Sequence, residues 1–420
     1  MQEQQLGLKG SEISLVCPKE MGQAWTTAVS SAKQELQAIF EESVVQIEEV
    51  GSGAIHSDSV RVVCKPIIDL AVSVRSITEA REKLPEMREA GYIHRFKRDN
   101  ENRLFFIKRT ESGEHTHHVY VLQSGCDLWN DLIHFRDYLS QNEDKLKKYM
   151  MIKQDLAQKY AQDRNLYNRS RAKFMHNVAV ESHEYFTLDQ DVTVVVTDPA
   201  TKERPYNIGY DKEKWETTGK KVTAYVVGES APVETFTGRV AATVHSPKED
   251  DRLVVVPKGK IIYEPEIEHD LQLQAEDAAI TYSCSHEKSC GAVLYTKVDG
   301  ERRYLLIKNR SFHAGFPKGH VEYGETEMET VHREILEETG LSVDVVEGFR
   351  REYDYKVRFF INKTAVYFLA SFGDQTIVPQ EGEVLDYWIV PLEEALEHLG
   401  FEQDRKILRD ADEYLNRLGY

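Results

Sequence analysis

The segment from Gly319 to Leu341 constrains this chain more than any other part of its 420 residues. Its second half has the apolar spacing of a helix from Glu325 to Thr339, followed by Gly340, the residue type that most often caps a helix C-terminus. The apolar positions that recur at helical intervals are Met328, Val331 and Ile335. The segment therefore predicts a loop followed by an amphipathic helix with one buried stripe.

Three glutamates lie on this predicted helix at positions i, i+3 and i+4, namely Glu334, Glu337 and Glu338. On a helix with 3.6 residues per turn they fall within an arc of about 100°. Carboxylates held so close repel one another unless a cation joins them. Hard oxygen ligands on one face favour Mg²⁺, with Mn²⁺ as the alternative, because these ions also bridge to substrate phosphates. We expect the three glutamates to form a divalent metal site.

The loop before the helix also has a predicted arrangement. Arg333 and Glu325 are expected to pair and to fix the loop against the helix. Glycines are expected to let the loop turn sharply, and they stand at Gly315, Gly319 and Gly324.

Together these residues resemble the Nudix box, which is matched at every defining position of the segment. The resemblance implies an α/β/α sandwich in which Glu334, Glu337 and Glu338 bind a divalent metal and the carbonyl of Gly319 contributes to the same site. The implied reaction is hydrolysis of a nucleoside diphosphate linked to another group. Metal ions serve this chemistry because they neutralise the anionic oxygens and lower the pKa of water.

The reaction also needs a carboxylate that accepts the proton of the attacking water. The candidates are the box residues Glu337 and Glu338, and Glu381 and Glu383 in the later segment PQEGEVLDYW. For the later pair, an exposed acidic turn is an equal alternative interpretation.

Residues around the box narrow the substrate. GFPKGHVE at 315–322, EGFRR at 347–351 and the segment WIVPLEEALEHLGFEQDRKIL resemble the asymmetrical diadenosine tetraphosphate hydrolases of the Nudix group. The resemblance covers about residues 289–420. It implies cleavage of diadenosine tetraphosphate to ATP and AMP.

Four residues are candidates for substrate binding. Lys318 and His320 are expected to face the polyphosphate, whose charge requires point cations as well as metal. Tyr353 and Tyr355 lie on a predicted strand beyond the box, where one ring could stack on adenine. The same alternation of residues is typical of any half-buried strand, so both interpretations stay open.

The chain length suggests about three domains. We predict a multidomain α/β and α+β protein. Its expected parts are a nucleotidyltransferase-like α/β domain at 1–184, a small β-barrel at 185–279 and a Nudix α/β/α sandwich at 280–420. The polar, helical segment at 264–279 is predicted to be a linker.

The N-terminal part contains EEVGSGA at 48–54, KPIID at 65–69 and THHVYV at 116–121. This series resembles the GrpB-like branch of the nucleotidyltransferase fold. Gly51 and Ser52 at a strand-to-helix turn offer amides to a phosphate, and with Asp69 they form a candidate upstream nucleotide site. Ala71 stands where nucleotidyl transfer would place a second carboxylate, which favours binding or scaffolding over catalysis.

The middle part contains YNIGY at 206–210, VTAYVVG at 222–228 and FTGRV at 236–240, and it resembles the barrel of soluble inorganic pyrophosphatases. Where that family carries an Asp-rich metal loop, this chain has Lys220 and Lys221, which cannot ligate Mg²⁺. We therefore predict a barrel without pyrophosphatase activity. Lys220, Lys221 and Arg239 either form a phosphate-binding surface or are simply structural.

Charge and hydropathy exclude several classes of function. The 71 acidic and 53 basic residues give a net charge of −18, which argues against a broad surface for long nucleic acid. Neither a membrane span nor a signal peptide is recognisable, so a cytoplasmic location is expected. The five scattered cysteines are expected to be reduced thiols.

The sequence thus predicts a cytoplasmic, Mg²⁺-dependent Nudix hydrolase that cleaves dinucleoside polyphosphates. One alternative is hydrolysis of another nucleotide, such as a nucleoside triphosphate, ADP-ribose or a capped RNA end. The other is a nucleotide sensor or scaffold with slow hydrolysis.

Overall fold

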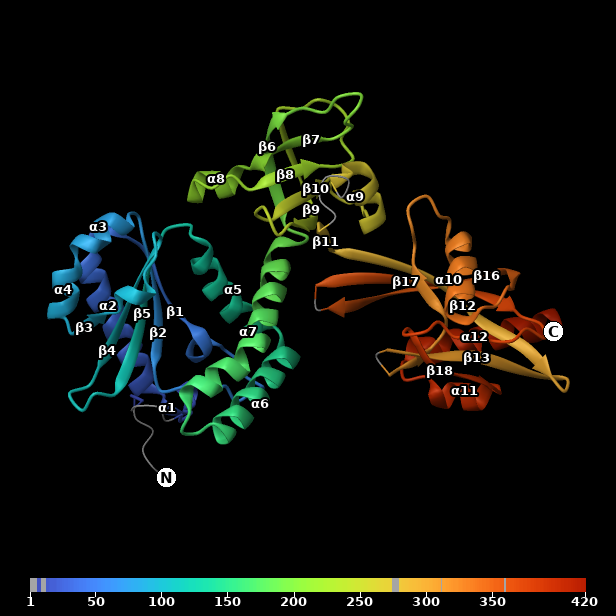
Figure 1. Ribbon diagram of the computed structural model, residues 1–420, viewed down its shortest axis with the longest axis horizontal. Coiled ribbons are helices and arrows are strands. Elements are labelled where there is room, and N and C mark those ends of the chain that lie inside the picture. Colours follow the sequence, from blue (N-terminus) through green and yellow to red (C-terminus); the bar gives the residue numbers. More distant parts are fainter. Residues whose placement is uncertain (1–5, 9–12, 274–278, 311, 359) are drawn as a thin grey trace. The chain divides into compact units, whose positions relative to one another are not determined.

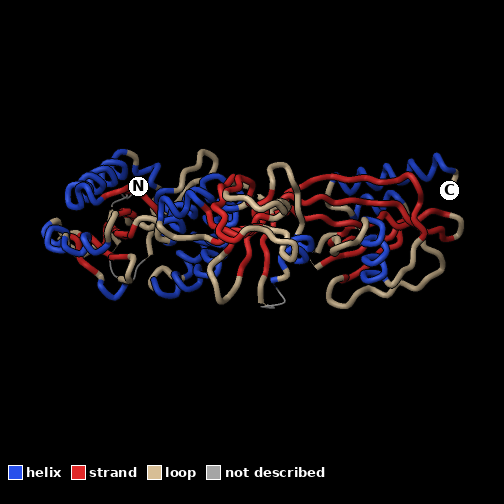
Figure 2. The backbone as a smooth tube through the Cα atoms, turned by 90° about the horizontal axis from the view of Figure 1, so that it is seen from above, coloured by secondary structure: helices blue, strands red, loops and turns tan. Residues whose placement is uncertain are grey.

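The computed structural model of this multidomain α/β protein describes residues 6–8, 13–273, 279–310, 312–358 and 360–420. The chain divides into two compact units, Met1–Thr187 with Asp211–Val222, and Leu188–Tyr210 with Thr223–Tyr420. Figure 1 labels the helices and strands, and Figure 2 distinguishes them by colour. The barrel and the C-terminal domain thus fall in the same unit.

The first unit is built around a five-stranded mixed sheet with strand order β1-β2-β5-β4-β3. β2 and β5 are parallel, and the other neighbouring pairs are antiparallel. The strands are β1 (Val44–Val50), β2 (Ile68–Val74), β3 (Tyr92–His94), β4 (Arg103–Arg109) and β5 (His115–Gln123). The register places Asp69 of β2 directly beside His118 of β5.

Helices cover both faces of this sheet (Figure 1). On one face α2 buries a stripe that includes Trp25 and Leu36 against the strands. On the other, residues of α5 pack over Val50, Ala71 and Leu122. The helices of the unit are α1 (Pro18–Met21), α2 (Gln23–Phe40), α3 (Ile77–Glu82), α4 (Leu84–Glu89), α5 (Asp127–Gln141), α6 (Glu143–Lys159), α7 (Arg164–Thr187) and α8 (Lys212–Thr218), with 3₁₀ turns η1 (Glu41–Ser43), η2 (Gly51–Ala54) and η3 (Phe96–Arg98).

The second unit begins with a five-stranded barrel that closes where β10 pairs with β9. The order is β10-β8-β7-β6-β9, and β11 extends the sheet beside β9. The strands are β6 (Asp191–Asp198), β7 (Asn207–Asp211), β8 (Thr223–Val226), β9 (Thr235–His245), β10 (Arg252–Val256) and β11 (Thr281–Cys284). The predicted barrel is therefore present, and its likeness to inorganic pyrophosphatases stays a prediction.

The predicted linker at 264–279 is partly structured. Its first half forms α9 (Glu264–Leu271), which buries Ile267 and Leu271 in the hydrophobic core of the barrel. Residues 274–278 lie outside the described residues. The apolar side of α9 therefore makes it part of the barrel domain.

The C-terminal domain has a seven-stranded sheet with the main order β14-β13-β12-β17-β16, while β15 pairs with β12 and β18 with β13. α10 packs on one face through Val331 and Ile335, and α12 packs on the other through Leu408 and Leu415. This is the expected α/β/α sandwich. The elements are β12 (His286–Val298), β13 (Glu301–Asn309), β14 (Ala314–Gly315), β15 (Lys318–His320), α10 (Glu327–Thr339), β16 (Asp344–Arg358), β17 (Ile361–Ser371), β18 (Val384–Val390), α11 (Leu392–His398) and α12 (Glu402–Leu418).

The glutamate-bearing helix begins two residues later than the apolar spacing predicts. Thr326 is its N-cap, because its hydroxyl accepts from the amide of Glu329 while the Glu329 carboxylate accepts from the amide of Thr326. Glu325 therefore belongs to the preceding loop. Gly340 ends the helix with φ of 72°, as predicted. Of the described helices, none combines the length and apolar composition needed to cross a lipid bilayer.

Candidate functional site

Glu334 lies on α10 and packs directly against Gly319 of β15. A Cβ atom added at Gly319 would lie 1.9 to 2.0 Å from the atoms of the Glu334 carboxyl group. Only glycine leaves room for this carboxylate at the sheet edge. Burial raises the pKa of Glu334, and the charge of Arg333 opposes that rise. The structure thus brings together two residues that the resemblance assigns to one metal site, and the metal site itself stays a prediction.

Glu338 lies one turn further along α10 and accepts a hydrogen bond from the backbone amide of Lys318 at 2.9 Å. Burial raises the pKa of Glu338 to about 7, and the charges of Glu334 and Glu383 act in the same direction. The hydrogen bond from Lys318 partly opposes this shift. Two neighbouring carboxylates of α10 therefore lie where an additional positive charge would be stabilising.

Arg333 connects the loop to the helix. Its Nε and Nη2 atoms donate to the two carboxylate oxygens of Glu325 at 2.7 and 2.9 Å, and Nη2 also donates to the carbonyl of His320 at 2.8 Å. This bidentate pair lowers the pKa of Glu325 to about 2. Nη1 donates to Glu334 at 2.6 Å and to Glu337 at 3.2 Å.

The glycines of the loop have different roles from those predicted. Gly324 has a φ of +82° and makes the expected turn. Gly315 and Gly319 instead lie in short strands and lack positive φ angles. The prediction of sharp turns at these two positions was wrong, because the chain is paired to the sheet there. Gly319 is needed for its contact with Glu334 instead.

Within the part of the chain that the structure describes, no group of three or more His, Cys, Asp or Glu side chains is arranged to hold a metal ion. Glu334 and Glu337 both bind Arg333, and Glu338 binds a backbone amide. The donors themselves still fit a hard divalent cation, because they are carboxylates on one helix and Gly319 leaves space beside them.

Lys318 and His320 lie at the two ends of β15. The His320 Nε2 atom lies 2.8 Å from the Lys363 ammonium and 3.5 Å from a carboxylate oxygen of Glu287, which Lys363 also contacts at 3.3 Å. These two side chains lower the pKa of Glu287 to about 2, and His320 contributes most. Glu287 and Lys363 are direct neighbours in the parallel pair β12–β17. No periodicity in the sequence indicates that register, so these two residues were missed.

Tyr353 and Tyr355 lie on β16 with ring centroids 5.4 Å apart and planes inclined by 36°. The Tyr353 hydroxyl donates to Asp404 at 2.9 Å, and its ring stacks on Tyr367. The ring of Tyr355 is half-buried. Burial raises the pKa of its hydroxyl, and the charges of Asp404 and Glu287 raise it further. Both rings are half-buried and pack against the core of the domain, and Tyr353 is in addition held by its hydrogen bond to Asp404.

The two later carboxylates are both in an exposed turn before β18. The charge of Glu383 contributes to the raised pKa of Glu338. The loop is tied to α10, because the amides of Val378 and Gln380 donate to the carbonyls of Thr339 and Glu338.

In the first unit, Gly51, Ser52 and Asp69 also lie together. Gly51 has a φ of +70°, and a Cβ atom there would lie 2.9 Å from a carboxylate oxygen of Asp69. Asp69 pairs with Nδ1 of His118 at 2.8 Å, and Ser52 accepts from the ammonium of Lys153. The cations around this group were missed, because they come from segments far apart in the sequence.

Two of the barrel cations have structural partners. Arg239 binds Asp189, Ser285 and the carbonyl of Lys260. Lys220 pairs with Asp127 within the first unit at 3.1 Å. These contacts favour the structural interpretation of both residues.

Comparison with known proteins identifies two families in this chain. The GrpB protein family matches residues 16–181, and the NUDIX domain family matches residues 288–411. Both of these predicted resemblances are confirmed. The assignment of the first domain to the nucleotidyltransferase fold stays a prediction.

Two curated relatives match nearly their whole lengths. The glutamate-rich protein GrpB of Alkalihalophilus pseudofirmus is 33% identical over 179 residues, which are 42% of this chain and 99% of the relative. The asymmetrical bis(5'-nucleosyl)-tetraphosphatase of Rattus norvegicus is 34% identical over 142 residues, which are 30% of this chain and 95% of the relative.

Two solved structures resemble separate parts of the chain. GrpB from Enterococcus faecalis is 24% identical with a TM-score of 0.35, and the match covers 39% of this chain and 95% of that one. The C. elegans Ap4A hydrolase binary complex is 25% identical with a TM-score of 0.30, covering 32% and 99% of the two chains.

Proposed function

Because the chain belongs to the GrpB family through its N-terminal part and to the Nudix family through its C-terminal part, we propose that the latter is a Mg²⁺-dependent hydrolase of dinucleoside polyphosphates. The preferred substrate is diadenosine tetraphosphate, which would be cleaved to ATP and AMP. The observation that carries this proposal is the packing of the Glu334 carboxylate on Gly319, one helical turn from the half-buried Glu338.

Glu334, Glu337 and Glu338 would hold Mg²⁺ or Mn²⁺. The chemistry that such an ion supplies when bound is neutralisation of the polyphosphate oxygens and a lower pKa for water. Arg333 is a positioning residue, because it fixes Glu325, the carbonyl of His320 and two of the α10 carboxylates in one network.

Lys318, His320 and Lys363 would bind the polyphosphate. His320 and Lys363 are joined by a hydrogen bond. Burial lowers the pKa of Lys363, and the charge of Lys318 adds to this effect, so Lys318 lies near Lys363. A group of cations beside the carboxylates suits a substrate with several negative charges. Tyr355 would stack on an adenine at the same edge.

Glu383 is the proposed proton acceptor among the loop carboxylates, because its charge reaches Glu338. Glu381 lies in the same exposed turn and provides a matched control. Replacing Glu383 by Gln should lower kcat by about a hundredfold, while the same change at Glu381 should leave kcat within about twofold of wild type. Equal effects of the two changes would remove Glu383 from this role.

The substrate is tested by product analysis on the full chain with Mg²⁺. The panel contains diadenosine tetraphosphate, ATP, ADP-ribose and a capped RNA end, and products are separated by chromatography. We expect prompt formation of ATP and AMP in equal amounts from the first compound. Two molecules of ADP, or faster cleavage of another compound, would contradict the proposed specificity.

A further inference from the structure

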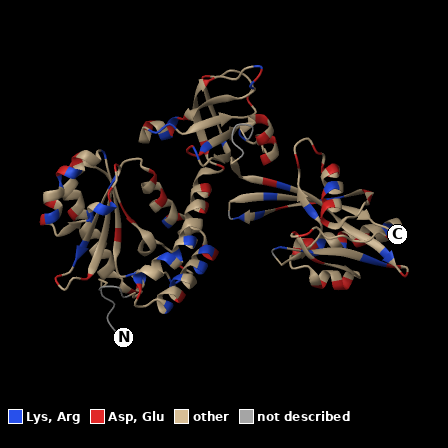
Figure 3. Ribbon diagram, viewed as in Figure 1, with Lys and Arg blue, Asp and Glu red and all other residues tan. Residues whose placement is uncertain are grey.

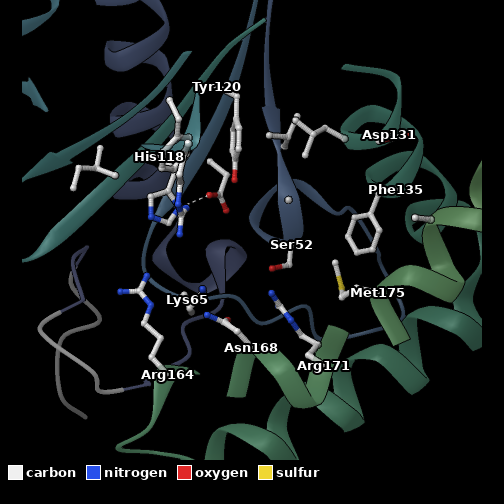
Figure 4. Close-up of a pocket in the computed structure, with 18 of the residues that line it drawn as sticks. Ser52, Lys65, His118, Tyr120, Asp131, Phe135, Arg164, Asn168, Arg171 and Met175 are labelled. Atoms are coloured by element: carbon white, nitrogen blue, oxygen red, sulfur yellow. Dashed lines mark hydrogen bonds and ion pairs between the residues drawn. The ribbon is translucent and has the colours of Figure 1, made fainter. Parts of the chain in front are cut away.

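A cavity of about 750 Å³ lies in the first unit, between the sheet and helices α5 to α7. Ligand pockets for small molecules have volumes in this range. Figure 4 shows Arg164 and Arg171 reaching into it from α7, opposite His118 and Tyr120 of β5. The site is distinct from the Nudix domain, and all of its residues belong to one compact unit.

Five Lys and Arg side chains line this cavity and come from three separate stretches of the chain. They are Lys65, Arg95, Arg98, Arg164 and Arg171. Within the described part of the chain, none of the five has a carboxylate partner within ion-pair distance. Because the chain has a net charge of −18, five Lys and Arg side chains without a carboxylate partner around one cavity are unexpected.

The cavity contains only limited negative charge of its own. Its two acidic lining residues are Asp69 and Asp131. Asp69 is hydrogen-bonded to Nδ1 of His118 at 2.8 Å. Burial alone would raise the pKa of Asp69, but His118, Lys65 and Lys153 lower it below its ordinary value. Two carboxylates, one of them already paired with His118, cannot neutralise five surrounding cations.

A sixth cation lies beneath the floor of the cavity. Lys153 is completely buried, and its ammonium donates to Ser52 Oγ and to the carbonyl of Val63 at 2.7 Å. Burial lowers the pKa of Lys153 to about 7, and the charge of Arg171 adds to this effect. Burial likewise lowers the pKa of Lys65 to about 7, with Arg171 and Arg164 contributing. An anion in the cavity would stabilise both ammonium groups.

The rest of the lining is largely apolar and aromatic, and it includes Phe105, Tyr120, Leu132, Phe135 and Met175. The guanidinium of Arg98 lies over the ring of Phe105, 4.9 Å from its centroid. A cavity lined by both cations and aromatic rings matches a ligand with a charged and a planar apolar part.

From this arrangement we infer that the cavity binds the polyphosphate group of a small molecule, with Lys65, Arg98, Arg164 and Arg171 as its contacts. The aromatic residues of the lining accommodate the nucleoside when the polyphosphate belongs to a nucleotide. His118 is oriented by Asp69, so its Nε2 atom, which has no hydrogen-bond partner among the described residues, is available to the same group.

Isothermal titration of the full chain in EDTA tests this inference with three probes: ATP, inorganic tripolyphosphate and adenosine. Omitting divalent metal makes the result independent of whether the Nudix domain hydrolyses anything. We expect ATP and tripolyphosphate to bind and adenosine to bind at least about tenfold more weakly. Tighter binding of ATP than of tripolyphosphate would assign the cavity to nucleotides, and the reverse would assign it to inorganic polyphosphate.

Matched variants connect that binding to the cavity. Arg164→Gln and Arg98→Gln should each weaken tripolyphosphate binding by about tenfold. Their controls are Arg169→Gln, an exposed residue on α7, and Lys97→Gln, an exposed neighbour of Arg98; neither control lines the cavity. Thermal unfolding without ligand should show no loss of stability in Arg164→Gln, since an unpaired cation is removed. Unchanged affinity in both variants, or adenosine binding as tightly as ATP, would overturn the inference.

Discussion

The α10 face of the Nudix domain and the cavity of the GrpB domain are opposite in charge. On α10, burial raises the pKa of Glu338, the nearby charge of Glu334 adds to this effect, and a cation would stabilise the two carboxylates. In the cavity, unpaired Lys and Arg side chains surround Asp69, and an anion would stabilise those. Figure 3 shows the charged positions along both regions. The two proposals thus give one chain a site for a metal ion and a second site for a polyphosphate, the kind of group that such ions commonly bind.

The two regions also differ in how the chain builds them. The acidic face comes from residues within one helix, so a spacing of three and four residues is enough to bring them together. The basic cavity needs β2, β4, β5 and α7 to fold first, because its lining residues are spread along the chain from Val50 to Ala179. Local sites can therefore be predicted from a sequence, and assembled sites require the structure.

The largest expected effect is on the acidic side. Glu338→Gln keeps the size of the side chain and an oxygen that can accept from the Lys318 amide, but it removes the negative charge. We expect turnover of diadenosine tetraphosphate to fall by at least about a hundredfold in steady-state assays with Mg²⁺. Glu393→Gln, an exposed position on α11, is the control. Near-normal turnover at saturating Mg²⁺ would remove Glu338 from the metal site.

The next effect tests the packing of Gly319 on Glu334. Gly319→Ala would force the Glu334 carboxylate to move, because the new Cβ atom would overlap it. We expect kcat to fall by about tenfold or more with little change in the melting temperature. Gly315→Ala is the matched control, since a Cβ atom there has no heavy atom within 4 Å. If both variants keep full activity, the close contact has no part in catalysis.

Much of the fold follows from the sequence, and the exceptions have physical causes. The mixed α/β character of the first domain, the barrel and the helix stripe of Val331 and Ile335 are predicted from the pattern of apolar residues, which burial enforces. The start of α10 was misplaced at Glu325, because apolar spacing does not reveal a capping box. The segment 264–279 was interpreted as a linker, although Ile267 and Leu271 are buried in the barrel.

The site divides in the same way. Arg333 and Glu325 form the pair that the sequence predicts, and Gly319 meets Glu334. Lys363 joins His320 only through the register of β17 with β12, which no local pattern specifies. The cavity cations were missed for the same reason. Only the pairing of β2 with β5 brings His118 beside Asp69.

A smaller effect concerns protons in the basic cavity. Burial lowers the pKa of Lys65 and Lys153 from 10.5 to about 7, and the groups that face Lys65 are Arg164, Arg171, Lys153 and Asp69. At a pH of about 8 both lysines are mostly neutral, and a bound polyphosphate should return them to the charged form. Binding should therefore take up between about one and two protons.

The uptake is measured by titration calorimetry in two buffers that differ in ionisation enthalpy. Because binding takes up protons above the lowered pKa, affinity should fall as pH rises from about 7 to 9, by up to about tenfold per unit for each proton. Lys65→Gln should remove about one proton from the uptake, and Arg169→Gln should not change it. Proton release on binding would contradict this account of the cavity.

The smallest effect distinguishes the two tyrosines of β16. Tyr353 is held by a hydrogen bond to Asp404 and by stacking on Tyr367, whereas the charge of Glu287 acts on Tyr355. If Tyr355 stacks on adenine, Tyr355→Leu should raise KM about fivefold, which corresponds to ~1 kcal/mol for one base–aromatic contact, and leave kcat unchanged.

Tyr353→Phe keeps its ring, so KM should not change, while loss of the hydrogen bond to Asp404 should lower the free energy of unfolding by ~1 kcal/mol. Steady-state kinetics and denaturant unfolding separate the two outcomes. An unchanged KM in Tyr355→Leu would leave this ring with the ordinary role of a half-buried strand residue.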